Sequence, residues 1–223
     1  AKNEIEKRKK GYISDLFWYS KKSSFKVSKN KFERNMFNKN KKIRILICTH
    51  CFYDNPHPFE QSSFKDFREW IEFLILIEKK TPHYDWKIKV HNDFLPGTLE
   101  ILNDILKKKK SNMEILPTDI SHHEIVKSGV THVTTCYGTV GFDYAFLNIP
   151  VINFNYNPRI NYKFNLHAEN SKKKYKKILL NLNNINIKIK NKEVYENYFM
   201  HYMNNKNIHL FFNHNKIKKK NFF

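Results

Sequence analysis

Residues 43–154 alternate short apolar runs, many of them β-branched, with longer stretches whose apolar positions recur at helical spacing. The apolar runs predict strands at 43–50, 86–91, 113–117, 130–136 and 151–154. The amphipathic stretches predict helices over 59–80, 97–110, 121–129 and 139–149. Strands that alternate with helices indicate a parallel sheet covered on both faces. We therefore expect an α/β, Rossmann-like doubly wound sheet of about five strands.

The helix at 121–129 carries its own boundary signals. Ser121 stands at the N-cap position, Glu124 follows three residues later as in a capping box, and Gly129 provides a stop. Capping is sufficient to explain Glu124.

The two ends of the chain differ in composition from the middle. Residues 1–42 are rich in lysine and asparagine and predict a basic tail or the remnant of an upstream domain. Residues 43–182 hold the predicted Rossmann-like domain. Residues 183–223 predict a basic extension with one amphipathic helix at 191–212.

Charge narrows the range of partners. The chain carries 41 Lys and Arg against 21 Asp and Glu, a formal net charge of +20. Its lysine runs are scattered and none is interleaved with a nucleic-acid motif, so nucleic acid is not the expected partner. A solvated face is one interpretation of the lysine runs, and peripheral contact with an anionic inner membrane is another.

The three cysteines suit a reducing cytoplasm, and no apolar run approaches the roughly 18 residues of a membrane span.

Polar residues collect where the predicted strands end. They are Thr49, His50 and Cys51 after the first strand, His91 and Asn92 after the second, Ser121, His122 and His123 after the third, and residues 134–138 at and after the end of the fourth. Doubly wound sheets bind ligands beyond the carboxyl ends of their strands, so these residues predict a binding site.

Gly138 and Gly141, two of only five glycines, lie three positions apart after the fourth strand. A glycine-containing turn lets backbone N–H groups approach a phosphate, and Thr135 and Thr139 can add hydroxyl donors. The pattern is neither G-x-G-x-x-G nor a Walker A loop, so it does not predict a dinucleotide or P-loop site.

Three segments, WKIKVHND (86–93), ILPTDISHHEIVKSGVTHVTTCYGTVGFDYAFLNIPVINFNYNP (115–158) and INYKFNLHAEN (160–170), carry a family resemblance. The chain resembles, over about residues 43–182, the C-terminal nucleotide-sugar-binding half of bacterial capsular and surface polysaccharide glycosyltransferases. These are GT-B enzymes typified by capsule Kdo transferases. The most specific parts are Lys-x-His at 89–91, Ser-His-His-Glu at 121–124 and Gly-Thr-x-Gly-x-acid at 138–143.

The resemblance implies roles for these residues. Lys89 and His91 would contact the donor phosphate, and the acid Asp143 would hold the ribose hydroxyls. The implied phosphate- and nucleotide-binding set is completed by Ser121, His122, Thr135, Gly138 and Thr139. The chain departs from the family pattern in two places, with His91-Asn92 where His-Pro is usual and Asp143 where Glu is usual.

Residues 48–59 predict a loop over the same site, in which His50 and Asp54 are candidates for an acid/base or acceptor-positioning pair. Cys48 lies inside an apolar strand and is expected to face the core, so no metal site is predicted there. Arg159, after the fifth strand, is a candidate cation for a phosphate or a sugar carboxylate. A surface loop arginine is the alternative.

The predicted function is glycosyl transfer from a nucleotide-activated sugar, with a CMP-linked sugar as first candidate, to a growing capsular or surface polysaccharide. The nucleotide-sugar is a substrate, no cofactor is expected, and the acceptor is a glycan or glycolipid. A GT-B enzyme needs a second domain for the acceptor, so we expect a fragment or a reduced member. A CDP-glycerol-type glycerophosphotransferase and a non-catalytic module that binds nucleotide or nucleic acid stay open as alternatives.

Overall fold

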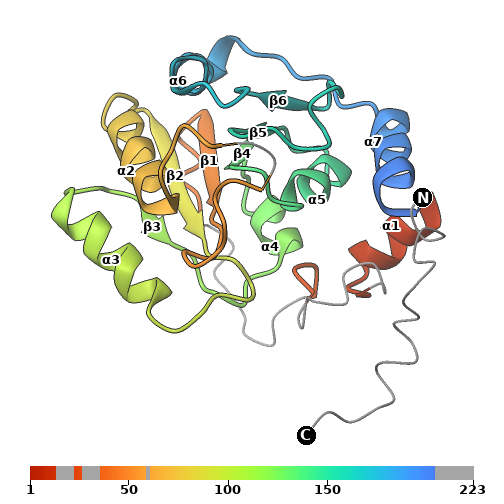
Figure 1. Ribbon diagram of the computed structural model, residues 1–223, viewed down its shortest axis with the longest axis horizontal. Coiled ribbons are helices and arrows are strands. Elements are labelled where there is room, and N and C mark those ends of the chain that lie inside the picture. The colour runs from red at the N-terminus through yellow and green to blue at the C-terminus, as the bar shows by residue number, and fades with distance from the viewer. Residues whose placement is uncertain (14–22, 27–35, 59–60, 204–223) are drawn as a thin grey trace, which may run out of the picture.

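The computed structural model describes residues 1–13, 23–26, 36–58 and 61–203 (Figure 1). A six-stranded parallel sheet runs through it in the order β3-β2-β1-β4-β5-β6. The strands are β1 (Ile43–Cys48), β2 (Tyr84–Lys89), β3 (Glu114–Ile115), β4 (His132–Thr135), β5 (Val151–Asn153) and β6 (Asn165–His167). This order is that of a doubly wound Rossmann-like sheet, which confirms the predicted fold class.

The sheet has one strand, β6, beyond the five that the apolar runs predicted. β6 has only three residues, and Leu166 is its one apolar side chain, so there is no apolar run for sequence patterning to find. It is a strand because the chain returns beside β5, where Val151 pairs with Asn165 and Asn153 with His167. Tertiary pairing, and not hydrophobic patterning, makes this edge strand.

Helices cover both faces of the sheet, as Figure 1 shows. They are α2 (Phe67–Glu78), α3 (Thr98–Lys108), α4 (His122–Lys127), α5 (Val140–Phe146) and α6 (Lys172–Leu180). Side chains alternate along β1, so Ile45 and Ile47 join the core with α2, α3 and α6. Leu46 and Cys48 point to the opposite core, with α4 and α5. The two cores fix β1 and its carboxyl end in the centre of the fold.

Local signals set several helix ends. The Asp66 side chain accepts from the Glu69 N–H at 2.7 Å, so α2 begins at Phe67 and not at residue 59 as expected; residues 59–60 lie outside the described part. Ser121 and Glu124 form the capping box predicted for α4. Gly129, just beyond α4, has a φ of 98°, a conformation that glycine adopts without strain.

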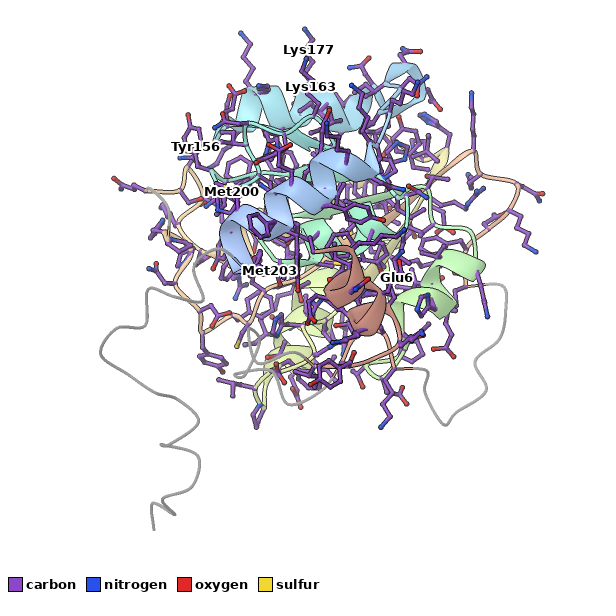
Figure 2. All side chains as sticks on the ribbon, turned by 90° about the vertical axis from the view of Figure 1, so that its right-hand side faces the viewer. Glu6, Tyr156, Lys163, Lys177, Met200 and Met203 are labelled. Carbon is purple, nitrogen blue, oxygen red and sulfur yellow. The ribbon has the colours of Figure 1, made fainter. Side chains whose placement is uncertain are left out.

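The two ends of the described chain pack together against α5. Helices α1 (Lys2–Lys9) and α7 (Asn191–Tyr198) lie side by side in Figure 2, and a π-helical turn, Phe199–Met203, continues α7. Ile5 is fully buried in one cluster with Phe142, Val194 and Tyr198. The described parts of both terminal segments thus share a core with α5, while residues 204–212 of the expected C-terminal helix lie outside the described residues. Within the described ranges, no helix is both long and apolar enough to cross a membrane.

Candidate nucleotide site

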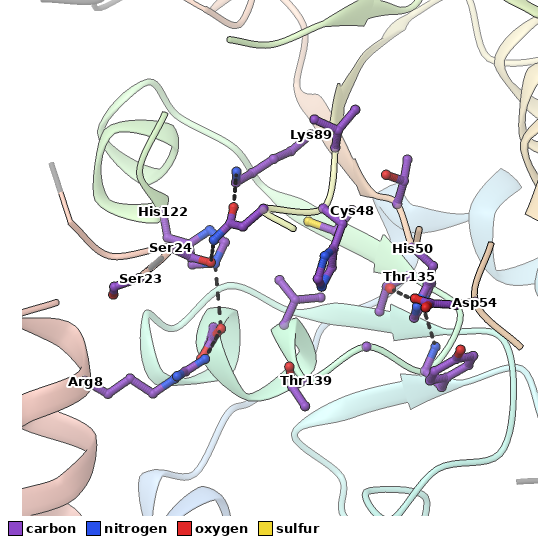
Figure 3. A pocket seen from close by; sticks show the side chains of 18 of the residues that line it. Arg8, Ser23, Ser24, Cys48, His50, Asp54, Lys89, His122, Thr135 and Thr139 are labelled. Carbon is purple, nitrogen blue, oxygen red and sulfur yellow. Dashed lines mark hydrogen bonds and ion pairs between the residues drawn. The ribbon is translucent and has the colours of Figure 1, made fainter. Parts of the chain in front are cut away.

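The carboxyl ends of β1, β2 and β4 border a cavity of about 350 Å³ (Figure 3). β1 and β4 are neighbours in the sheet, and the strand order reverses between them, so the cavity lies at the topological switch point. Ten predicted site residues line it: His50, Asp54, Lys89, His91, His122, Thr135, Gly138, Thr139, Asp143 and Arg159.

Ser121 is the predicted residue that the structure does not bring to the cavity wall. It is 1% exposed, and both its N–H and its hydroxyl are bonded to Glu124 as the cap of α4. The geometry therefore assigns Ser121 to helix capping.

Arg159 holds the turn that follows β4. Its side chain is 1% exposed, and Nη2 donates to the carbonyl oxygens of Tyr137 and Gly138 at 2.8 and 2.9 Å. The guanidinium also lies 4.8 Å from the centre of the Phe142 ring. Burial lowers its pKa to about 10, so it stays cationic at neutral pH. Arg159 is thus a buried cation beneath the turn, and not a surface loop arginine.

The bonds to Arg159 also orient the donors of the turn. In a trans peptide the carbonyl and the following N–H point in opposite directions. The N–H groups of Gly138 and Thr139 therefore point away from the guanidinium. Neither donates a hydrogen bond to any other described residue. Two adjacent backbone donors that bond to no acceptor among the described residues are suited to bind an oxyanion.

His50 supports the same turn from β1. Its ring stacks on Phe67 with centroids 4.7 Å apart, and its Nε2 lies 3.2 Å from Thr135 Oγ1 and 3.4 Å from the Tyr137 N–H. Burial lowers its pKa to about 3. Because Nε2 already accepts from the turn and the ring is neutral, the geometry favours a positioning role for His50 over the predicted acid/base role.

Asp54 and His91 lie at the open side of the cavity. Both are exposed, and the His91 Nδ1 accepts from the Asp93 N–H at 3.2 Å. Within the described residues, the Asp54 carboxylate and the His50 ring share no hydrogen bond or ion pair, and His50 Nε2 contacts Thr135 and Tyr137 instead. Their roles in catalysis stay predictions.

Lys89 brings a second cation to the cavity, at the end of β2. It is 3% exposed, and its Nζ donates to Asn92 Oδ1 at 3.0 Å. Burial lowers its pKa, because a charged ammonium is poorly solvated there. A bound anion would restore the solvation that burial removes.

Asp143 forms an ion pair that the sequence did not predict. Its Oδ1 and Oδ2 accept from Nε and Nη2 of Arg8 at 2.7 and 2.8 Å, and His122 Nε2 lies 3.7 Å from Oδ2. His122 Nδ1 is 3.0 Å from the Tyr144 hydroxyl. Asp143 thus lines the cavity with both carboxylate oxygens already held.

Sequence reasoning missed the part that the terminal segments play in this site. Arg8, Ile13, Ser23, Ser24 and Tyr202 all line the cavity. Arg8 lies in a lysine-rich run whose only pattern is charge, so no signal in the sequence separates it from its neighbours. Among the residues that the structure describes, the cavity included, no three His, Cys, Asp or Glu side chains gather as metal ligands would.

Comparisons with known proteins give structural likenesses only. No protein-family model matches the chain, and no curated protein matches it. Among solved structures it is similar to UDP-GlcNAc 2-epimerase from Methanocaldococcus jannaschii in complex with UDP-GlcNAc and UDP, with 17% identity, a TM-score of 0.45, and 69% of this chain and 44% of that chain covered. It is also similar to KpsC, the β-Kdo 2,4-transferase of Thermosulfurimonas dismutans, with 14% identity and a TM-score of 0.48. This match covers 75% of this chain and 48% of that chain.

A third likeness is to UDP-GlcNAc 2-epimerase from Neisseria meningitidis bound to UDP-GlcNAc, with 14% identity and a TM-score of 0.46. The match covers 74% of this chain and 45% of that chain. The chain spans less than half of the length of each of these three proteins.

Proposed function

We propose that the chain is the nucleotide-sugar-binding part of a glycosyltransferase, with a CMP-linked sugar as its first candidate donor. The observation that carries the proposal lies at the switch point, where the buried cation Lys89 and the turn residues Gly138 and Thr139 line the same cavity, and Arg159 holds the turn carbonyls so that the Gly138 and Thr139 N–H groups face away from the guanidinium. These groups suit a phosphate, while the carboxylate of Asp143 in the same cavity suits the hydroxyl groups of a ribose.

This arrangement fits the electrostatic demand of glycosyl transfer. When a nucleotide leaves, negative charge grows on its phosphate, and donors that are already aimed at that charge lower the barrier. Arg159 and His50 hold the turn before any ligand arrives, so little reorganisation is needed. His91, at the open side, accepts at Nδ1 from the Asp93 N–H, so its neutral ring carries the proton on Nε2 and can donate from there to the same phosphate.

A matched pair of lysines on β2 tests the site. Lys89 lines the cavity. Lys87, two residues earlier and 7% exposed, does not line it and forms an ion pair with Glu114, in which Nζ lies 2.8 Å from Oε2. We expect CMP, CDP, UDP or GDP to raise the thermal midpoint of the parent protein. Lys89→Met should abolish that rise, while Lys87→Met should lower the midpoint of the free protein and keep the rise. Equal losses in both variants would contradict the proposal.

Donor competition separates the proposal from its alternatives. CDP-glycerol that binds more tightly than any nucleotide-sugar would favour a glycerophosphotransferase. A nucleic-acid-binding module would instead show binding of oligonucleotides that falls steeply with salt and that free nucleotide does not compete away. For the glycosyltransferase we expect the reverse: competition by free mononucleotide and a weak salt dependence.

We also propose a glycan or glycolipid acceptor and peripheral contact with an anionic membrane. The sequence of α6, KKKYKKILL, supports the second proposal, because a lysine-rich helix near a surface is attracted to anionic lipid. Vesicles that contain phosphatidylserine should retain the protein at low salt, whereas neutral vesicles should not.

A further inference from the structure

The ion pair between Arg8 and Asp143 joins the first helix of the chain to the floor of the cavity. Two parallel N–H donors of one guanidinium meet the two oxygens of one carboxylate at 2.7 and 2.8 Å, the bidentate geometry that fixes orientation most strongly. The side chains of Arg8 and Asp143 are 14% and 4% exposed. Asp143 therefore has one defined orientation, and Arg8 sets it.

Other contacts hold α1 in place independently of this pair. Ile5 is fully buried against Phe142 and Val194, and the Lys9 carbonyl lies 2.8 Å from His123 Nε2. The Arg8 guanidinium also lies 5.7 Å from the centre of the Phe25 ring. These contacts hold α1 and the Arg8 side chain beside the cavity in addition to the ion pair with Asp143.

Residues 23–26 complete the same wall. The Ser24 carbonyl accepts from the His122 N–H at 2.8 Å, and the Ser24 hydroxyl accepts from Asn92 Nδ2, beside Lys89. Figure 3 shows Arg8, Ser23 and Ser24 across the cavity from Thr135. The described N-terminal residues thus form a side of the site that strand ends alone do not supply.

Arg8 also determines the charge of Asp143. Burial alone would raise the pKa of this carboxyl, but Arg8 and His122 outweigh burial and hold it at about 2. A carboxylate offers about four acceptor positions, of which Arg8 takes two. Because Asp143 is ionised and lines the cavity, the acceptor positions that Arg8 does not take remain for a ligand.

We propose that Arg8 is a positioning residue of the nucleotide site, which fixes the Asp143 carboxylate as the acceptor for the 2′-hydroxyl of a ribonucleotide. The N-terminal helix is then part of the binding site and not a tail. This inference rests on the proposed nucleotide-binding function and adds a specificity, ribose over 2′-deoxyribose, that depends on Arg8.

The test compares CMP and UDP, each beside its 2′-deoxy counterpart, by calorimetric titration of the full chain. We expect the parent to bind the ribonucleotide about tenfold or more tightly than the deoxynucleotide, as a hydrogen bond to a charged group would give. Arg8→Gln and Asp143→Asn should each reduce that ratio to about one. A purely structural role of Arg8 would instead weaken both ligands equally and keep the ratio.

Three further variants keep the test decisive if Arg8→Gln does not fold. Arg8→Lys keeps the charge without the bidentate fork and should give an intermediate ratio. The exchange Arg8→Asp with Asp143→Arg restores the ion pair but removes the acceptor, so it should restore the thermal midpoint and not the ratio. Lys7→Gln, on an exposed side chain of the same helix, is the matched control and should match the parent.

The outcomes separate this inference from the function on which it rests. If the parent binds neither CMP nor UDP, the proposed function fails and the inference fails with it. If the parent binds them but Arg8→Gln or the exchanged pair keeps the ribose preference, the inference is overturned and nucleotide binding stands.

Discussion

Gly141 and Arg159 are packed so closely that a Cβ atom on residue 141 would lie 2.8 Å from the Arg159 Nε. The guanidinium cannot move aside cheaply, because its Nη2 is held by two carbonyl oxygens of the turn. This contact explains the second of the two glycines that lie three positions apart. Gly141 admits the buried cation, while Gly138 belongs to the turn that the cation holds.

Gly141→Ala should therefore weaken both folding and nucleotide binding. Overpacking of a buried site costs about 1–3 kcal/mol of unfolding free energy, and displaced Arg159 would release the turn. We expect urea unfolding to show the first effect and CMP titration to show a loss of affinity. Gly129→Ala, at a positive φ beyond α4 and away from the cavity, is the control and should lower stability only. Unchanged CMP affinity in Gly141→Ala would argue against the role given to Arg159.

Thr134 and Thr135 are adjacent on β4 but serve opposite faces of the sheet. The Thr134 hydroxyl bonds the Tyr175 hydroxyl in the core, whereas Thr135 lines the cavity. Each Thr→Val change removes one buried hydroxyl and should cost about 1 kcal/mol of stability. Only Thr135→Val should also weaken nucleotide binding, by about tenfold. A loss of affinity in Thr134→Val as large as that in Thr135→Val would contradict this assignment.

Ser121→Ala should separate capping from binding at one position. Ser121 accepts from the Glu124 N–H and does not line the cavity, so the change should cost about 1 kcal/mol of unfolding free energy. Nucleotide affinity should stay that of the parent. A fall in affinity without a fall in stability would restore the binding role that the sequence resemblance implied.

The buried histidines should make the fold sensitive to acid. Burial lowers the pKa of His50 to about 3, and of His132 and His167 to about 4, from 6.5. Protonation then favours the unfolded chain, so this stability is present above pH 6.5 and is lost as pH falls toward these values. His50 alone should cost about 2 kcal/mol between pH 7 and pH 5.

Urea unfolding at pH 7 and pH 5 measures that loss. We expect His50→Gln to reduce the difference between the two pH values, since its side chain does not titrate there. The exposed His83 supplies the matched control, and His83→Gln should leave the difference unchanged. The same difference in the parent and in His50→Gln would show that His50 takes up no proton on unfolding.

The sequence alone predicts the alternation of strands and helices and the edge of the sheet at which the predicted site residues gather. Hydrophobic periodicity is local, so apolar runs identified β1 and β5, and capping residues identified the ends of α4. The carboxyl ends of parallel strands meet at one edge of a sheet. The position of polar residues at those ends, such as Lys89 and Thr135, is therefore enough to place them together.

Which groups meet, and in which charge state, depends on how the whole chain folds. Arg8 and Asp143 are 135 positions apart, and nothing in a lysine-rich run marks Arg8 as the partner of a buried carboxylate. β6 forms because residues 165–167 return beside β5 and pair with it in parallel. His50 is neutral because burial removes it from water and lowers its pKa. Such contacts depend on the path of the whole chain and on burial, and neither is encoded in the spacing of neighbouring residues.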